Sequence, residues 1–247
     1  MAIVTITSCG KQSDNKYFVE NQTVVTDEYS MPAKLTIPKS NHKVPGVVMV
    51  HGSGANNMNE SIGKLNLFKD LSEQLGDNGI ASIRYDKRVF TYLDKISKDY
   101  SFTIYDEVID DAISALKILK NDVRIDENNL FIVGHSFGGQ LAPVIANVAK
   151  EEGINIKGVI SLAGTTEHII DLTMRQYLRN DKATYDIYAP WYQYFRDIKK
   201  VKPNELKYFF MGAYETYWVS YNNLNLEDEI LECSSNCEMS FLHGKLD

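Results

Sequence analysis

Four short stretches of the chain are largely apolar, without the regular polar positions that a half-exposed strand would show. Residues 44–50 read VPGVVMV, and similar runs cover residues 80–85, 130–133 and 159–163. Runs of this kind are typical of strands buried on both faces, as in a parallel sheet that carries helices on either side. We therefore predict central strands at these four positions.

Between these runs, apolar residues recur at helical spacing. The clearest case is residues 103–119, whose apolar side chains form one face of a predicted helix. Thr103 and Asp106 have the spacing of a capping box at its start. Further helical patterns cover residues 65–75 and 140–149. Strands that alternate with helices predict an α/β fold, a mostly parallel sheet with helices on both faces.

The alternation defines the expected domain limits. Residues 1–21 resemble a leader or linker, and residues 22–247 form one predicted domain that opens with strands over residues 23–37. Residues 165–229 interrupt the pattern, because they have few strand signals and hold roughly half of the aromatic side chains. We predict that this segment is a helical cap over the sheet, with most aromatics in its own small core and a few lining a pocket.

Composition excludes several classes of protein. The chain has 247 residues, a formal net charge of −7 and 44% hydrophobic residues, which is ordinary for a globular protein. The acidic balance argues against nucleic-acid binding, since phosphate recognition needs clustered basic side chains. Lys199, Lys200 and Lys202 form the main local basic cluster, which fits a solvated surface. No apolar run reaches the roughly 18–20 residues that span a bilayer. We expect no metal and no cofactor.

The cysteines leave the cellular location open. Ile6-Thr7-Ser8-Cys9 resembles a bacterial lipobox, although no basic segment precedes it and the apolar stretch is short. Either Cys9 is the lipidated residue of an exported lipoprotein, in which case it is the expected link to a membrane, or the likeness is coincidental and the protein is cytoplasmic. Cys233 and Cys237 would pair in an exported protein and would stay free thiols in a cytosolic one.

The sequence GHSFGG follows the apolar run at residues 130–133. Gly134, Ser136 and Gly138 form a G-x-S-x-G pentapeptide between a predicted strand and a predicted helix. In this context the serine sits in a strained turn that exposes its hydroxyl, and the flanking glycines leave room for that turn. The helix that follows points its N-terminus at the site and favours developing negative charge. The alternative is an ordinary glycine-rich turn with a surface serine.

A second glycine-rich turn, HGSG, follows the strand at residues 44–50. Acyl transfer needs backbone N–H groups aimed at the carbonyl oxygen as it gains charge. We assign one such donor to Ser53, in the turn that His51 and Gly52 begin, and the other to Phe137, directly after the predicted nucleophile. The alternative is a tight turn without a catalytic role.

The two motifs together resemble those of α/β-hydrolases, specifically the bacterial esterase branch related to dienelactone hydrolases and acyl-peptide hydrolases. VVMVHGSGANNMNESIG, IRYDKR, GHSFGGQLAP and SLAGTTEHIIDL are similar to that group in order and spacing. The resemblance implies a triad in the order serine, acid, histidine. The acid would be Asp247, in the G-x-x-D turn behind a strand at residues 239–242, where it would orient the histidine.

No histidine follows Asp247 in the sequence, and the five that precede it fit other positions. Of these, His168 is the least implausible substitute for the general base. The family fold also continues beyond its acid turn with another strand and a closing helix. We therefore expect a C-terminally incomplete chain in which the last strand and helix of the fold are missing.

Two hypotheses follow. The first is a carboxylesterase that acts on small or medium acyl esters, a small-molecule substrate class, through an acyl-enzyme at Ser136. A thioesterase or peptidase would differ only in the pocket. The second is a non-catalytic α/β-hydrolase-fold binding protein or an inactive fragment, because the expected histidine is missing. Labelling by a fluorophosphonate distinguishes the two.

Overall fold

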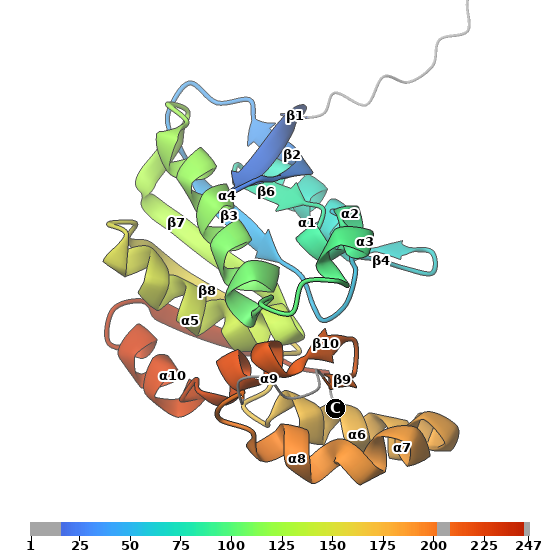
Figure 1. The fold of residues 1–247 in the computed structure, drawn as a ribbon. Helices are drawn as coiled ribbons and strands as arrows, with labels where there is room; N and C mark the ends of the chain where they lie inside the picture. The colour runs from blue at the N-terminus through green and yellow to red at the C-terminus, as the bar shows by residue number, and fades with distance from the viewer. Residues whose placement is uncertain (1–15, 202–207, 245–247) are drawn as a thin grey trace, which may run out of the picture.

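A seven-stranded sheet forms the centre of the computed structural model, which describes residues 16–201 and 208–244 (Figure 1). The order across the sheet is β1-β2-β6-β3-β7-β8-β11. The last five of these strands run parallel, and β1 and β2 form an antiparallel hairpin at one edge. The strands are β1 (Tyr17–Thr26), β2 (Tyr29–Pro38), β3 (Val44–Val50), β6 (Ala81–Tyr85), β7 (Ile125–His135), β8 (Ile156–Leu162) and β11 (Glu238–Leu242).

Helices cover both faces of the sheet. On one face α4 (Asp110–Asn121) and α5 (Phe137–Glu151) pack against each other and against β3 and β7. On the other face α1 (Leu67–Asp77) packs on β6 and β2, and its Ser72 hydroxyl accepts a hydrogen bond of 2.7 Å from Arg84. Ile83, next to Arg84 in β6, points to the opposite face and is fully buried, which is the alternation of a strand. The predicted α/β class is confirmed.

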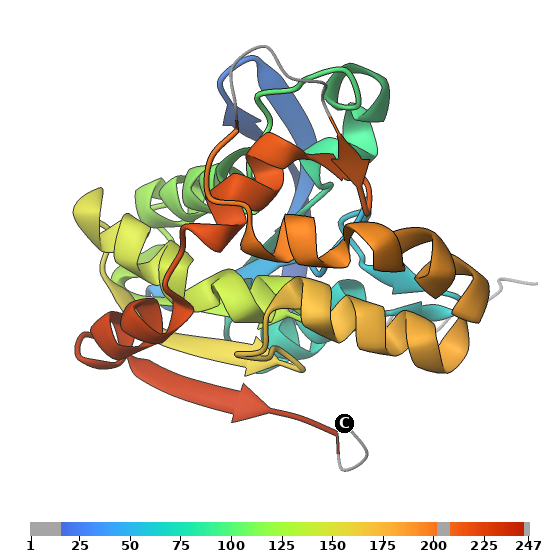
Figure 2. The ribbon, with the colours of Figure 1, turned by 60° about the horizontal axis from the view of Figure 1, so that its bottom comes forward.

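The segment predicted to be a cap is mainly helical and lies over one end of the sheet (Figures 1 and 2). Two two-stranded hairpins lie outside the main sheet. The helices of this segment are α6 (Ile169–Asn180), α7 (Lys182–Tyr188), the 3-10 turn η2 (Ala189–Trp191), α8 (Tyr192–Asp197), α9 (Glu215–Asn222) and α10 (Leu226–Ser234). The remaining elements are α2 (Arg88–Thr91), α3 (Leu93–Ile96), β4 (Ser61–Ile62), β5 (Leu65–Asn66), β9 (Phe209–Phe210) and β10 (Ala213–Tyr214).

The segment's aromatic side chains pack mainly on one another. Phe195 and Phe210 stack with ring centroids 4.5 Å apart, and Trp218 meets Phe210 edge-on at 5.8 Å. All three are buried, and the Trp218 indole N–H donates to the Phe210 carbonyl at 3.0 Å. These three side chains form a small aromatic core within the segment, whereas Trp191 and Phe209 are 45% and 56% exposed.

Several boundaries differ from those predicted. β1 begins at Tyr17, so the predicted leader of residues 1–21 ends too late, because residues 17–21 pair with β2. The helix predicted over residues 103–119 starts with a π-helical turn, η1 (Tyr105–Ile109), before α4. Its capping box is confirmed, since the Thr103 N–H donates to an Asp106 carboxylate oxygen at 2.8 Å and the Asp106 N–H reaches back to the Thr103 hydroxyl at 3.4 Å.

A buried ion pair joins α4 to the start of α2. The Arg88 guanidinium is 1% exposed and donates to the Asp111 carboxylate at 2.5 Å. The same guanidinium lies 4.7 Å from the centre of the Tyr29 ring, in cation–π geometry. This pair ties the start of α2 to α4. In the described ranges, no helix is long and apolar enough to cross a membrane.

At the opposite edge of the sheet from β1, β11 runs parallel to β8 (Figure 2). Within the described residues β8 is its partner in the sheet. Phe241 and Leu242 of β11 are 48% and 57% exposed. The predicted strand before the acid turn is therefore present, whereas Asp247 lies outside the described residues.

Candidate active site

Ser136 joins β7 to α5 through a sharp turn. Its backbone has φ 52° and ψ −115°, which is unfavourable for a residue with a Cβ atom. Two backbone hydrogen bonds hold the turn: the Ser136 N–H donates to the Leu162 carbonyl at 2.8 Å, and the Gln140 N–H donates to the Ser136 carbonyl at 3.0 Å. Leu162 ends β8, so the neighbouring strand fixes the turn. In the part of the chain that the structure describes, no side chain is hydrogen-bonded to the Ser136 hydroxyl.

The glycines of the pentapeptide are required by close backbone packing. A Cβ atom on Gly134 would lie 2.2 Å from the Gly138 carbonyl oxygen, which is far below any real contact. A Cβ atom on Gly138 would lie 2.3 Å from the Val50 carbonyl oxygen and 2.5 Å from that of His51. The first helical turn of α5 therefore presses against the end of β3. Only glycine allows the serine turn to approach the HGSG turn this closely.

The HGSG turn lies directly beside the serine turn. A Cβ atom on Gly52 would be 3.2 Å from the Cβ of Ser136, so the two turns are in contact. The Gly52 N–H donates to the Glu60 carboxylate at 2.8 Å, and the Gly52 carbonyl accepts from Lys87 at 2.9 Å. Phe137 is buried at the start of α5. The structure thus brings together the turn of the predicted nucleophile and both backbone segments predicted to supply oxyanion donors.

His51 is the first residue of the HGSG turn and its side chain is buried. It is 1% exposed, and its Nε2 lies 3.1 Å from the Asn57 carbonyl, a geometry in which Nε2–H donates. Phe68 and Tyr85 pack against the ring with centroids 5.0 and 5.4 Å away. Burial, together with the Lys87 ammonium, lowers the pKa of His51 to about 3. His51 is therefore neutral at physiological pH and has a packing role.

His135, His42 and His168 make their contacts with groups other than the Ser136 hydroxyl. His135 lies 2.9 Å from a Glu60 carboxylate oxygen through Nδ1, and His42 lies in an exposed loop. His168, the least implausible substitute base, has both nitrogens engaged. Its Nδ1 accepts from the Ile170 N–H at 3.2 Å and caps α6, and its Nε2 lies 2.9 Å from the Asn222 amide oxygen. Burial also lowers the pKa of His168.

His243 follows β11 and lines a small cavity of about 180 Å³ with Ser161, Gly164 and Phe241. This cavity does not include Ser136 among its lining residues. Across residues 16–201 and 208–244, none of the five histidines is hydrogen-bonded to the Ser136 hydroxyl. The described side chains therefore supply no histidine base in contact with the predicted nucleophile.

A cavity of about 480 Å³ lies between the HGSG turn, the start of α5 and the cap. Ser53 and Phe137, the two predicted oxyanion donors, line it together with aromatic side chains of the cap such as Tyr177 and Trp218. Ser136 itself is not among the lining residues. Glu107 also lines it and accepts a hydrogen bond of 2.5 Å from the Tyr217 hydroxyl. Most of the lining is apolar, with a few polar groups near the HGSG turn, which is the usual composition of a small-molecule site.

Sequence reasoning missed the polar residues that hold the HGSG turn. Lys87 and Glu107 are buried and form an ion pair of 2.6 Å. Lys87 lies two residues after the end of β6, where the sequence alone does not distinguish it from a lysine on a solvated surface. Glu60 is a third buried polar residue beside the turn. Its contacts with Gly52 and His135 depend on a loop whose path the sequence does not specify.

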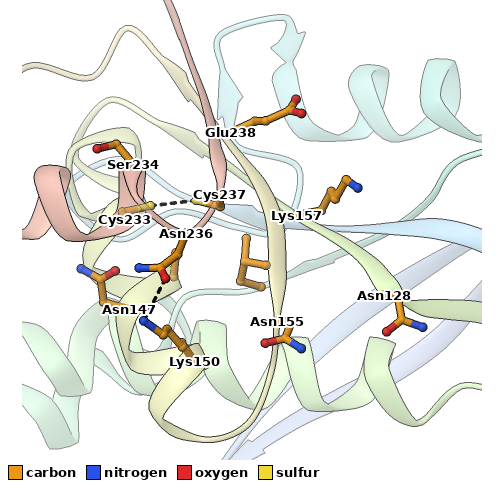
Figure 3. Close-up of a pocket in the computed structure, with 12 residues that line it drawn as sticks. Asn128, Asn147, Lys150, Asn155, Lys157, Cys233, Ser234, Asn236, Cys237 and Glu238 are labelled. Carbon is orange, nitrogen blue, oxygen red and sulfur yellow. Dashed lines mark hydrogen bonds between the residues drawn. The ribbon is translucent and has the colours of Figure 1, made fainter.

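A second cavity, of about 580 Å³, lies at the far end of the sheet, where β8 and β11 begin (Figure 3). Asparagine and lysine side chains dominate its lining, and Lys150 donates to the Asn236 amide at 3.0 Å. Cys233 and Cys237 border it as free thiols whose sulfur atoms lie 3.0 Å apart. Cys9 lies outside the described residues. In the described ranges there is no cluster of side chains that could hold a metal ion.

The chain is similar to α/β-hydrolases. A family model described as alpha/beta hydrolase fold matches residues 103–207. The chain is 41% identical over 141 residues to esterase EstD of Thermotoga maritima, a match that covers 57% of this chain and 32% of that protein. The chain thus spans about a third of the length of this relative.

Solved structures agree on the fold. Est1E from Butyrivibrio proteoclasticus matches with a TM-score of 0.59 and 17% identity, over 92% of this chain and 78% of that one. A hypothetical protein from Pseudomonas aeruginosa matches with a TM-score of 0.58 and 12% identity, over 93% and 78%. The chain has the α/β-hydrolase fold.

Proposed function

We propose that this chain carries the catalytic core of a serine hydrolase that cleaves carboxylic esters, with Ser136 as the nucleophile. The main support is the backbone of Ser136, with φ 52° and ψ −115° between glycines that tolerate no Cβ atom. A non-glycine residue in such a conformation costs on the order of 1–3 kcal/mol, and strain of this kind is concentrated at functional sites. A serine with only a structural role gains nothing from this turn.

In the proposed reaction the Ser136 oxygen attacks the carbonyl carbon of the ester. The carbonyl oxygen becomes negatively charged and accepts hydrogen bonds from the N–H groups of Ser53 and Phe137. The base takes the proton of the Ser136 hydroxyl and passes it to the leaving alcohol; water then gives a proton to the same base as it attacks the acyl-enzyme, which releases the acid and restores Ser136. α5 starts at Phe137 and adds the positive end of its helix dipole.

The substrate class follows from the cavity beside these donors. Its volume of about 480 Å³ and its aromatic lining suit an uncharged acyl group of small or medium length. The 41% identity to an esterase over 141 residues supports the same class. Thioesters and peptides share the attack chemistry, so a comparison of ester, thioester and anilide substrates tests this preference.

A second candidate, a binding protein with the same fold, has one observation in its favour. Among the described residues no histidine contacts the Ser136 hydroxyl, and a serine without a base is a weak nucleophile. The esterase proposal requires a base other than these five histidines, which Asp247 would orient as the family resemblance implies, so its tests are made on the full-length protein.

Hydrolysis of a p-nitrophenyl ester series from acetate to decanoate tests the proposal, with Ser136→Ala as the matched control. The esterase proposal predicts release of p-nitrophenol that is fastest for short or medium chains and that falls to background in the variant. Equal rates for the two proteins would contradict it. Binding of the esters without hydrolysis by the wild type would favour the second candidate.

A further inference from the structure

Lys87 is buried beneath the HGSG turn and has two polar partners. Its side chain is 3% exposed, and its ammonium donates to the Gly52 carbonyl at 2.9 Å and to a Glu107 carboxylate oxygen at 2.6 Å. A buried ammonium is costly unless each of its hydrogens finds an acceptor. The carboxylate would satisfy the charge by itself. The Gly52 carbonyl accepts a second hydrogen of the ammonium, and the effect of this contact on the turn has an explanation of its own.

That explanation lies in the geometry of the peptide bond. The carbonyl of Gly52 and the N–H of Ser53 belong to one planar unit, in which they point in opposite directions. A group that fixes the carbonyl therefore also fixes the direction of the Ser53 N–H. A charged donor on the carbonyl also polarises the unit and strengthens the N–H as a donor. Ser53 is one of the two proposed oxyanion donors, and it lines the cavity.

Two further hydrogen bonds hold the same turn. The Gly52 N–H donates to Glu60 at 2.8 Å, and the Asn56 amide donates to the Gly52 carbonyl at 3.1 Å. Glu60 is 2% exposed and has φ 47°, so its position is itself constrained. The Gly52–Ser53 peptide consequently has little freedom to rotate, and Lys87 is its only charged hydrogen-bond donor among the described residues.

Lys87 also connects this peptide to the cap. Glu107, its carboxylate partner, accepts a hydrogen bond of 2.5 Å from the Tyr217 hydroxyl of α9. Tyr217 is 8% exposed, and both it and Glu107 line the cavity. Burial and the Glu107 carboxylate raise the pKa of Tyr217, so its hydroxyl keeps its proton and donates. A continuous chain of contacts thus runs from the cap to the proposed oxyanion donor.

We propose that Lys87 is a positioning residue for the oxyanion hole: it orients and polarises the Gly52–Ser53 peptide, and Glu107 and Tyr217 hold it in place from the cap side. This inference rests on the proposed esterase function. Lys87 does not touch the reacting atoms. Its contribution grows only as the ester oxygen becomes negatively charged, so it affects kcat rather than KM.

The test replaces Lys87 with methionine, which keeps the length of the side chain and removes the ammonium. With p-nitrophenyl butyrate we expect kcat to fall roughly 10- to 100-fold. Losing a whole oxyanion donor costs about 10²- to 10³-fold, whereas in this variant the Ser53 N–H remains and only loses the contact that fixes its direction. We expect KM to change less than about twofold. Lys120→Met is the matched control, because Lys120 also donates to a glycine carbonyl, that of Gly153 at 2.8 Å, far from the site.

Lys87→Met leaves the Glu107 carboxylate buried without its cation, which can prevent folding. The double variant Lys87→Met/Glu107→Gln removes that unpaired charge and gives the same expected loss of kcat. Tyr217→Phe keeps Lys87 and Glu107, and we expect a loss of less than about fivefold. A folded single or double Lys87 variant with the wild-type kcat, or with a raised KM at constant kcat, would overturn the inference.

Labelling by a fluorophosphonate separates this inference from the proposed function. The probe needs the nucleophile and the oxyanion donors, but no particular acyl group. Labelling of wild-type Ser136 with slower labelling of the Lys87 variants supports both proposals. Equal labelling of the two refutes the role of Lys87 alone. Absence of labelling in the wild type refutes the proposed function, and the inference about Lys87 falls with it.

Discussion

Replacement of Gly138 by alanine tests the packing that defines the site. The added Cβ atom would lie 2.3 Å from the Val50 carbonyl oxygen, whereas real Cβ contacts are not closer than 3.0 Å. α5 and β3 must therefore separate by at least the missing 0.7 Å. The positions of the added Cβ atom and of the Val50 carbonyl oxygen are both fixed by the backbone, so no side chain can rotate to relieve the clash. Overpacking of this kind costs about 3 kcal/mol.

The higher helix propensity of alanine offsets about 1 kcal/mol of this cost, which leaves a net destabilisation of about 2 kcal/mol. The shift also moves the Phe137 N–H away from that of Ser53, and a displacement of this size slows reaction roughly 10- to 100-fold. Urea unfolding and the rate of fluorophosphonate labelling measure the two effects. Wild-type stability together with a wild-type labelling rate in Gly138→Ala would refute the reasoning.

Gly153→Ala is the control for this variant. Gly153 has φ 71°, and a Cβ atom there would meet nothing within 4 Å. The substitution therefore adds only backbone strain, of about 1 kcal/mol. We expect it to lower stability slightly and to leave labelling of Ser136 unchanged.

Three further predictions concern buried and paired side chains. Asp111→Ala removes the nearest carboxylate from the buried Arg88 guanidinium and leaves Asp106 at 3.6 Å, so we expect a loss of about 3 kcal/mol in urea unfolding. Folding lowers the pKa of His51 to about 3. As the pH drops from about 6.5 towards 3, this histidine therefore binds a proton in the unfolded chain but not in the folded one, and the stability of the folded state falls. Between pH 7 and pH 5 the stability advantage of the wild type over His51→Gln should shrink by about 2 kcal/mol. Cys233 and Cys237 should form an intramolecular disulfide with oxidised glutathione, which leaves as two reduced molecules, and the intact mass should fall by about 2 Da.

Each of these predictions has an outcome that contradicts it. For the ion pair, the exposed pair of Lys182 and Asp186 is the control, and Asp186→Ala should cost less than about 0.5 kcal/mol. Equal losses in the two aspartate variants would refute the argument from burial. A pH-independent difference between wild type and His51→Gln would refute the lowered pKa. A lasting mixed disulfide with glutathione at Cys237 would show that Cys233 is out of reach.

Much of the fold can be predicted from hydrophobic patterns, because each central strand is a continuous apolar run buried by helices on both faces. The capping box at Thr103 is also predictable, because both of its partners lie within four residues of each other. The serine turn is recognisable from its pentapeptide, although Leu162 and Val50, which hold it, are distant in the sequence. The start of β1 at Tyr17 is different. Its residues 17–21 are exposed or half-buried at the edge of the sheet, and no apolar pattern distinguishes them from a linker.

The support of the HGSG turn could not be predicted for another reason. Lys87, Glu107 and Tyr217 come from three segments, and the last two are separated by 110 residues. Their contacts depend on how the cap packs over the sheet. In the sequence, the lysine resembles one on a solvated surface and the tyrosine one of many cap aromatics. Only the tertiary structure shows that they meet beneath the proposed oxyanion donor.

The central claim is that Ser136 is a reactive nucleophile. The most direct measurement is to incubate the protein with a fluorophosphonate and to locate the adduct by mass spectrometry of its peptides. The account predicts one phosphonate on Ser136 in the wild type and none in Ser136→Ala. An unmodified Ser136 in folded wild-type protein, or a phosphonate at another serine in both proteins, would contradict it.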